Sequence, residues 1–295
     1  IFMKLALIQE KQNKLYSFNQ PDLRFTKDQI MELQKEMIDQ NLKMIQRAIS
    51  HNVDLVLTSE AINFVGNPYR YQEKPYDLVV SSQDYLLEAC AKLAKQGKTY
   101  LVVGMLLAKE HQQLSNSAVV FNKNGQICFA YDKVFLAGDE NDYLRPGSHF
   151  PIWDSEFGKV GIAICYDMQF PETIRAYAKQ GADLILCPTW GWENIYARCR
   201  AYENGIYLAS AMAVPFYKDI IDLRSPSEVI GPDGQVLACA GNSSKEILFY
   251  QINDIRDCKR QRELRQVMIA KWQSFSKRYS ATVLWNDVIW RITRD

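Results

Sequence analysis

The two halves of this chain repeat one order of predicted secondary structure, and this repeat limits the possible folds more than any other feature. In the first half, strands are expected at residues 3–9, 53–58 and 99–107, and helices at 27–50 and 82–96. In the second half, strands are expected at 159–165, 182–188 and 207–213, and helices at 171–180 and 193–204. Short apolar strands that alternate with helices are typical of sheets whose faces are covered by helices.

Two hairpin segments extend the repeat. Residues 115–127 and 225–236 align with one residue of difference in the turn, and each has glycine where a hairpin requires positive φ. Neither G-x-G-x-x-G nor G-x-x-x-x-G-K-[ST] occurs, so the phosphate-binding loops of nucleotide folds are missing. We therefore predict an α/β fold, a pseudo-symmetric α-β-β-α sandwich.

Composition excludes several classes of partner. Hydrophobic residues make up 47% and charged residues 23% of the 295 residues, which fits neither a disordered nor a membrane-spanning chain. The net charge of +1 gives no overall attraction to nucleic acid or to anionic lipid. The chain has no run of 18 apolar residues and no secretory pattern at its start, so we expect a cytoplasmic location and no membrane partner.

Cysteine and histidine usage argues against a metal site. The seven cysteines are odd in number, include no C-x-x-C pair and lie mostly in apolar runs, as reduced thiols do. The three histidines, His51, His111 and His149, form no ligand cluster and offer little material for a Cys-His pair. We expect no metal and no cofactor.

Cys165 is the strongest candidate for a reactive group. It ends the apolar strand expected at 159–165, and after a short turn Pro171 occupies the favoured first position of a helix. The carboxyl end of such a strand, beside free backbone N–H groups, is where α/β sheets bind ligands. A buried structural thiol is the alternative for a cysteine in an apolar strand, so the assignment needs support from other residues.

Two charged residues supply that support. Glu60 ends the apolar segment 53–60, where a carboxylate without a partner is costly, and Lys133 lies between aromatic and aliphatic neighbours. Each alone is also consistent with a simple ion pair. Together with Cys165 they provide a base, an anion stabiliser and a nucleophile, and a thiol with a pKa of about 8.5 needs such a base.

These residues resemble the nitrilase superfamily, the carbon–nitrogen hydrolases, whose triad follows the chain order Glu, Lys, Cys. The likeness is carried by residues 57–60, 131–133 and 164–172 and continues through 140–147, 187–190, 200–204 and 232–234. It extends from Met3 to about Tyr250. The resemblance implies the same α-β-β-α sandwich of nitrilase type that the repeat predicts.

The resemblance also implies roles for individual residues. Cys165 would be the nucleophile and Glu60 the general base, while Lys133 would stabilise the tetrahedral intermediate together with the backbone N–H of Tyr166. Glu140 matches a second carboxylate that positions the amide or the attacking water. Without the resemblance, Glu140 would be read as a solvated acid of its loop.

The chain departs from the family pattern at three places. Ser59 stands where the family usually has proline before the base. Tyr166 and Asp167 follow the nucleophile where nitrile-cleaving members have Trp-Glu, which favours the amidase and N-carbamoyl-hydrolysing branches. Gln169 stands near the place where some carbamoyl amino acid hydrolases use arginine to bind a carboxylate, and Arg224 is a weak candidate for that role.

The sequence therefore predicts thiol-dependent hydrolysis of a non-peptide C–N amide bond in a small molecule. Phe64 and Trp190 are expected to wall the substrate pocket, although aromatic residues at such places also serve in core packing. An N-carbamoyl amine or amino acid amidohydrolase is the alternative, because the same triad can attack a ureido carbonyl. A catalytically silent binding protein of the same fold is a more remote one.

The domain prediction separates the body of the chain from its C-terminal part. Residues 1–253 are expected to form the carbon–nitrogen hydrolase domain, and 254–295 a basic helix and an apolar tail of the same unit. The tail, with Trp285 and Trp290, is too apolar to lie in water. We expect it at a subunit interface, in a homodimer or higher homo-oligomer, because family members usually pair; folding back onto its own subunit is the alternative.

Overall fold

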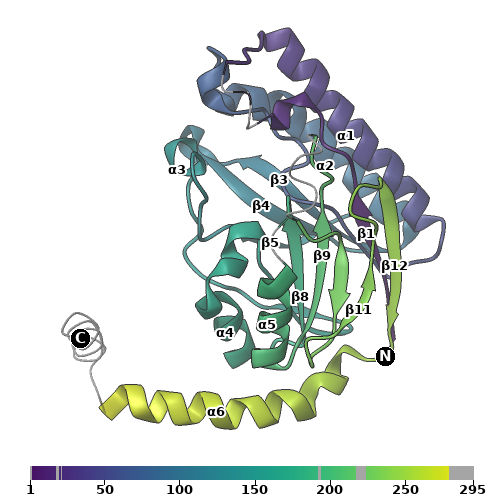
Figure 1. Ribbon diagram of the computed structural model, residues 1–295. Helices are drawn as coiled ribbons and strands as arrows, with labels where there is room; N and C mark the ends of the chain where they lie inside the picture. Colours follow the sequence, from purple (N-terminus) through teal and green to yellow (C-terminus); the bar gives the residue numbers. More distant parts are fainter. Residues whose placement is uncertain (1, 18–19, 21, 192–193, 217–223, 279–295) are drawn as a thin grey trace.

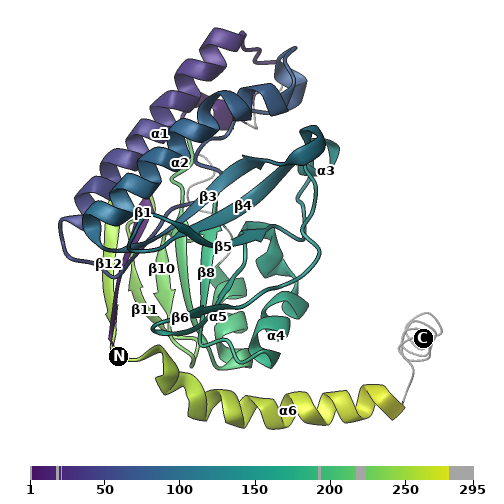
Figure 2. The same cartoon turned by 180° about the vertical axis from the view of Figure 1, so that it is seen from behind.

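Two six-stranded sheets lie face to face in the computed structural model, with helices on both outer sides (Figures 1 and 2). The structure describes residues 2–17, 20, 22–191, 194–216 and 224–278. The first sheet has the spatial order β12 (Glu246–Ile252), β1 (Met3–Gln9), β2 (Leu55–Leu57), β3 (Tyr100–Ala108), β4 (Leu114–Phe121), β5 (Ile127–Asp132). The second has the order β11 (Val236–Cys239), β10 (Glu228–Ile230), β9 (Tyr207–Met212), β8 (Leu184–Thr189), β7 (Gly158–Ile162), β6 (Trp153–Ser155).

The two sheets have the same pattern of strand directions. β1, β2 and β3 are parallel to one another, as are β7, β8 and β9. In each sheet two antiparallel strands extend this parallel core on one side, β4 and β5 in the first and β10 and β11 in the second. One antiparallel strand, β12 or β6, closes the other side. The predicted pseudo-symmetric sandwich is confirmed.

Helices cover the outer face of each sheet. α1 (Lys27–Ile49) and α2 (Pro75–Gly97) follow β1 and β2, and α4 (Pro171–Lys179) and α5 (Asn194–Asn204) follow β7 and β8. The α1 helix begins with a capping box in which the side chains of Thr26 and Gln29 each accept a backbone N–H of the other residue. The α2 helix begins seven residues earlier than predicted, because Pro75 occupies its first turn and Leu78 and Val79 are buried.

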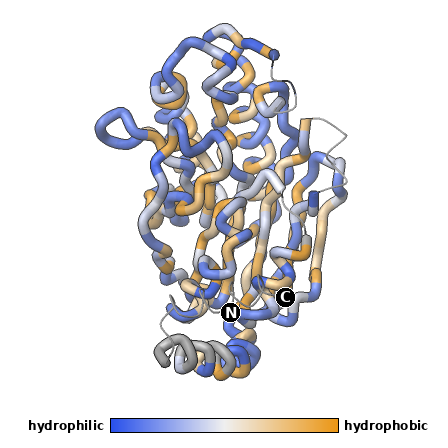
Figure 3. Tube along the Cα trace, turned by 60° about the vertical axis from the view of Figure 1, so that its left-hand side comes forward, coloured by the Kyte–Doolittle hydropathy of each residue, from blue (hydrophilic) through white to orange (hydrophobic). Residues whose placement is uncertain are grey.

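Three apolar layers result from this arrangement. One lies between the sheets, a second between the first sheet and its two helices, and a third between the second sheet and α4 and α5. Figure 3 shows hydrophobic residues concentrated in the central strands and hydrophilic residues in the peripheral loops. Because both faces of each sheet are covered, the central strands have the nearly continuous apolar sequences from which they were predicted.

The C-terminal helix α6 (Lys259–Arg278) starts after a short 3-10 turn, η6 (Ile255–Cys258), and runs out past the body of the molecule (Figures 1 and 2). Its first turns are held by Arg262, whose Nη1 lies 2.7 Å from Asp183 Oδ1 and donates to the Ala182 carbonyl. The apolar tail from 281 onward lies outside the described residues. Its role, the division at residue 253 and the homodimer therefore stay predictions.

Among the helices that the structure describes, none combines the length and apolarity needed to cross a membrane.

Gly104 of β3 lies close to the end of β2 in its own sheet and to β8 of the other sheet. A Cβ atom at Gly104 would lie 2.2 Å from the Ser59 carbonyl oxygen, 2.9 Å from the Glu60 Cα and 3.0 Å from the Pro188 Cβ. Two of these three atoms belong to the backbone, so rotating a side chain cannot make room. Glycine at this position lets the segment that carries Glu60 lie against β3 and β8.

We expect Gly104→Ala to lower the free energy of unfolding by about 1–3 kcal/mol, since the backbone must shift to admit the methyl group. Urea unfolding measures this loss. Gly241→Ala is the matched control, because the atoms that its Cβ would meet belong to the side chains of Ser244 and Glu246. The control should change stability by less than about 0.5 kcal/mol. Wild-type stability of Gly104→Ala would contradict the close approach.

Candidate active site

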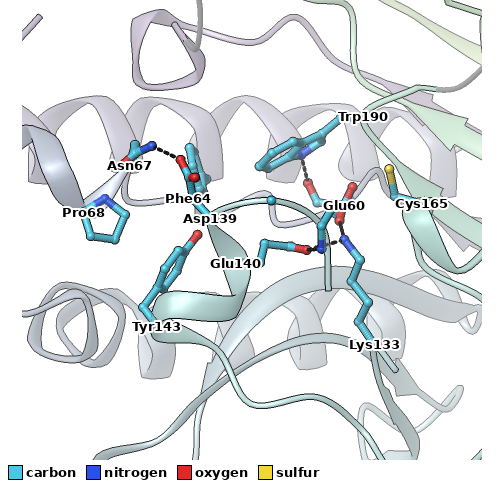
Figure 4. Close-up of a pocket in the computed structure, with 12 residues that line it drawn as sticks. Glu60, Phe64, Asn67, Pro68, Lys133, Asp139, Glu140, Tyr143, Cys165 and Trp190 are labelled. Atoms are coloured by element: carbon cyan, nitrogen blue, oxygen red, sulfur yellow. Dashed lines mark hydrogen bonds and ion pairs between the residues drawn. The ribbon is translucent and has the colours of Figure 1, made fainter. Parts of the chain in front are cut away.

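Strand ends bring the four predicted catalytic side chains into one place (Figure 4). Glu60 follows β2, Lys133 follows β5 and Glu140 opens the short helix α3 (Glu140–Tyr143). Cys165 opens the 3-10 turn η4 (Cys165–Gln169) beyond β7. All four line a single cavity of about 290 Å³. The predicted residues, 105 positions apart in the sequence, are thus brought together by the packing of the two sheets.

Lys133 is a buried ammonium held between two carboxylates. Its Nζ lies 2.8 Å from Glu60 Oε1 and 2.8 Å from Glu140 Oε2, and only 2% of its side chain is exposed. Burial disfavours the charge, but the carboxylates of Glu60 and Glu140 outweigh burial and hold the pKa of Lys133 above its ordinary value. Lys133 is therefore charged at neutral pH.

Asn116 of β4 joins the same network, and the sequence analysis missed it. Its Nδ2 donates to Glu60 Oε1 and to Glu140 Oε1, both at 2.8 Å. Its backbone carbonyl accepts the backbone N–H of Lys133 at 2.8 Å. The signal in the sequence is an amide two positions before the apolar run of β4, because a buried amide requires partners. Asn116 fixes the spacing of the two carboxylates around the lysine.

Cys165 differs from the prediction in its local structure. The strand β7 ends at Ile162, three residues before the expected end, and Cys165 has a left-handed backbone with φ of 43°. Strain of this kind is found at functional positions that their surroundings hold in place. As the second residue of η4, Tyr166 has a backbone N–H with no acceptor inside the turn.

The environment of Cys165 keeps the thiol protonated at rest. Burial raises the pKa of Cys165 to about 12, and the negative charge of Glu60 adds to this effect. Lys133, the Thr189 hydroxyl and the Trp190 backbone N–H act in the opposite direction. Glu60 Oε2 is buried and has no hydrogen-bond partner among the described residues, which leaves this oxygen available to accept a proton.

Asp167 ties the nucleophile turn to the segment that carries Lys133. Its Oδ2 accepts the Tyr131 hydroxyl at 2.7 Å and the Ile164 backbone N–H at 2.9 Å, and its Oδ1 accepts the Phe135 backbone N–H at 2.9 Å. Burial raises the pKa of Asp167 to about 6, against the effect of these hydrogen bonds. Residues 131–135 and the turn around Cys165 are therefore held in a fixed relation.

The predicted aromatic wall is present. Phe64 and Trp190 both line the cavity, with ring centroids 4.9 Å apart. The indole Nε1 of Trp190 donates to the Glu60 carbonyl oxygen at 2.7 Å, which fixes the ring against the catalytic segment. Arg224 donates through Nη1 to the Trp190 carbonyl and is not among the residues that line the cavity.

The cavity also contains residues that the sequence analysis did not select: Asn67, Pro68, Ala137, Gly138, Asp139 and Tyr143. Within the described ranges, no group of three or more His, Cys, Asp or Glu side chains is arranged to hold a metal ion.

Comparison with known proteins places this chain in a known class of hydrolase. The carbon-nitrogen hydrolase family model matches residues 7–260. This chain belongs to the carbon-nitrogen hydrolase family, so the resemblance to the nitrilase superfamily and the prediction of an enzyme of this class are confirmed.

Individual relatives agree with this assignment. The chain is 28% identical over 255 residues to omega-amidase NIT2 of Mus musculus, covering 81% of this chain and 89% of that protein. It is 31% identical over 191 residues to a probable nitrilase of Schizosaccharomyces pombe, covering 57% of this chain and 69% of that protein. The solved structure of an amidase from Nesterenkonia sp. matches with a TM-score of 0.69 and 25% identity, over 92% of this chain and 96% of that one.

A further carboxyl group, Glu10, lies behind the site. It is fully buried after the end of β1, and its Oε1 accepts the hydroxyl of Ser59, the residue that replaces the family's usual proline. Burial raises the pKa of Glu10 from 4.5 to about 7, while the Ser59 hydrogen bond and Lys245 oppose the rise. The departure at Ser59 thus provides a hydrogen-bond donor to a buried acid next to Glu60.

Glu10 should make stability depend on pH. Because the folded state favours the protonated carboxyl, the contribution of Glu10 to stability is largest below pH 4.5 and is lost as the pH rises through about 7, by roughly 3 kcal/mol. Glu10→Gln mimics the protonated form and should remove this loss. Urea unfolding of both proteins between about pH 4 and pH 8 tests it.

Asp167 has a raised pKa as well, so some pH dependence will remain in Glu10→Gln. The difference between the stability curves of the variant and of the wild type isolates the contribution of Glu10. Stability curves that stay parallel across this range would contradict the prediction.

Proposed function

We propose that this chain hydrolyses a non-peptide C–N amide bond in a small molecule through an acyl-enzyme on Cys165. The observation that carries the proposal is the buried ammonium of Lys133, held 2.8 Å from both Glu60 and Glu140 in the cavity that Cys165 lines. A base, a nucleophile and a cation thus face one space, as acyl transfer requires.

In the first step, Glu60 Oε2 takes the thiol proton while Sγ attacks the amide carbonyl carbon. Lys133 Nζ and the Tyr166 backbone N–H donate to the oxyanion that develops. The tetrahedral intermediate collapses when the protonated Glu60 returns the proton to the departing nitrogen. Ammonia or an amine leaves, and the acyl group remains on Cys165 as a thioester.

In the second step, Glu60 acts again as the base. It takes a proton from water, and the hydroxide attacks the thioester; the tetrahedral intermediate then collapses, the carboxylic acid leaves, and the protonated Glu60 returns its proton to the thiolate of Cys165. Glu140 also holds Lys133 and positions the amide or the water. Because burial raises the pKa of Cys165 to about 12, the reaction cannot rely on a preformed thiolate, and Glu60 is required in both steps.

Relatives support the choice of amides. Two of the similar proteins are named an omega-amidase and an amidase. The N-carbamoyl alternative uses the same residues, so a panel of ω-amides, aliphatic amides and N-carbamoyl amines, assayed by ammonia release, separates the two. Turnover of carbamoyl compounds alone would replace the amidase proposal with this alternative.

Cys165→Ala should lower kcat by at least about a thousandfold with the fold retained, since no other group supplies the nucleophile. Rapid quench with a slowly hydrolysed amide should give an acyl mass increment on the peptide that contains Cys165. Cys199→Ala is the control, because Cys199 is exposed and away from the cavity, and it should keep wild-type turnover. An increment on Cys187 or Cys199 instead would refute the assignment.

Lys133 and Glu60 should act as one unit with the thiol. Lys133→Arg keeps the charge but not the shape, and Glu60→Gln removes the base, so each should lower kcat more than about tenfold. The double variant should be little worse than either single one. Steady-state kinetics with circular dichroism as a folding check measures this. If either single variant keeps more than a tenth of wild-type kcat, the triad is wrong.

A further inference from the structure

The cavity has a second polar end, away from the thiol. Figure 4 shows Cys165 on one side of Glu60 and Lys133, and Asn67, Asp139 and Tyr143 toward the opposite side. Asn67 Nδ2 donates to Asp139 Oδ2 at 2.6 Å. Among the described residues, Asp139 Oδ1 has no hydrogen-bond partner. Asp139 is exposed and lines this end of the cavity, so its carboxylate can meet the remote part of a substrate there.

The charges that line the cavity are unbalanced. Among the described residues that line the cavity, three carboxylates, those of Glu60, Asp139 and Glu140, stand against one cation, Lys133. Lys133 is already engaged by Glu60 and Glu140, so it does not compensate Asp139. Arg224, which the sequence analysis considered as a carboxylate ligand, does not line the cavity, and its charge interacts with Cys165 and Glu60 at the other end. The described part of the lining therefore offers no free cation to an anionic group at the Asp139 end.

The middle of the cavity is apolar and aromatic. Phe64 and Trp190 lie between the two polar ends, and Pro68 and Tyr143 add apolar surface at the end remote from the thiol (Figure 4). Such walls pack against a short alkyl chain, and the faces of the aromatic rings also attract cations. A volume of about 290 Å³ is at the lower end for ligand sites, which suits a short linear molecule.

We propose that the preferred substrates are short linear amides that carry a primary ammonium group at the end remote from the amide, and that Asp139 binds this ammonium. The inference rests on the proposed amide hydrolysis at Cys165 and adds the chemical class of the substrate. Asp139 Oδ1 accepts a hydrogen bond from the ammonium, while Asn67 holds Oδ2 in place. Asp139 is thus a specificity residue and takes no part in bond breaking.

The test compares three amides of similar length: 5-aminopentanamide, hexanamide and glutaramate, which differ in the charge of the remote end. For the wild type we expect kcat/KM to fall in that order. Asp139→Asn should lower kcat/KM for 5-aminopentanamide about fivefold through KM, the upper range for a partly exposed ion pair. The same substitution should raise kcat/KM for glutaramate and change kcat/KM for hexanamide by less than about twofold.

Asp142→Asn is the matched control. Asp142 lies on the short helix α3, which Asp139 precedes as the N-cap residue; it carries the same charge and accepts the Tyr69 hydroxyl at 2.6 Å, but it does not line the cavity. Its substitution should leave the ratio of 5-aminopentanamide to hexanamide unchanged. Raising NaCl to about 1 M should reduce this ratio for the wild type, because salt screens the attraction.

The outcomes separate this inference from the proposed function. Hydrolysis of hexanamide with a preference for glutaramate, or an equal loss on all three amides in Asp139→Asn, overturns the inference and leaves the amidase intact. If Asp142→Asn shifts the ratio of kcat/KM for 5-aminopentanamide to kcat/KM for hexanamide as much as Asp139→Asn does, the inference is also overturned. The effect would then come from the net charge of the protein and not from a contact with Asp139. Turnover of none of the three amides by the wild type overturns the proposed function and this inference with it.

Discussion

The buried ammonium of Lys133 is the interaction on which the rest of the site depends. A charge that is 2% exposed is stable only with partners at hydrogen-bond distance, and removal of one partner leaves an uncompensated charge in the interior. Glu60, Glu140 and Asn116 must therefore all keep their positions. Four segments, β2, β4, β5 and α3, meet around one nitrogen atom, so an error in the packing of any of them disturbs the whole site.

The pseudo-symmetric sandwich explains why the site lies where it does. The first half supplies Glu60 and Lys133 from the ends of β2 and β5, and the second half supplies Cys165 and Trp190 from the ends of β7 and β8. Gly104 lets these ends approach, and Asp167 connects the nucleophile turn to the Lys133 segment. Neither half alone holds a base, a cation and a thiol, so the site exists only when both sheets are packed.

The sequence predicted the fold well because covered strands require continuous apolar runs, which repeat in both halves. The grouping of Glu60, Lys133 and Cys165 was also predictable, because charged residues at the ends of apolar strands stand out. Asn116 was missed, since its two hydrogen bonds join residues 56 and 24 positions away that only packing brings near. The left-handed turn at Cys165 was missed as well, because the apolar pattern continues past the end of β7.

Glu10 is a second buried acid beside the segment that carries the general base. If it were ionised, a carboxylate would lie in the interior with the Ser59 hydroxyl as its hydrogen-bond donor. Burial raises the pKa of Glu10 to about 7 and so keeps much of it neutral, with Ser59 as hydrogen-bond donor. The serine that departs from the family pattern therefore holds a buried acid against the segment that carries the general base.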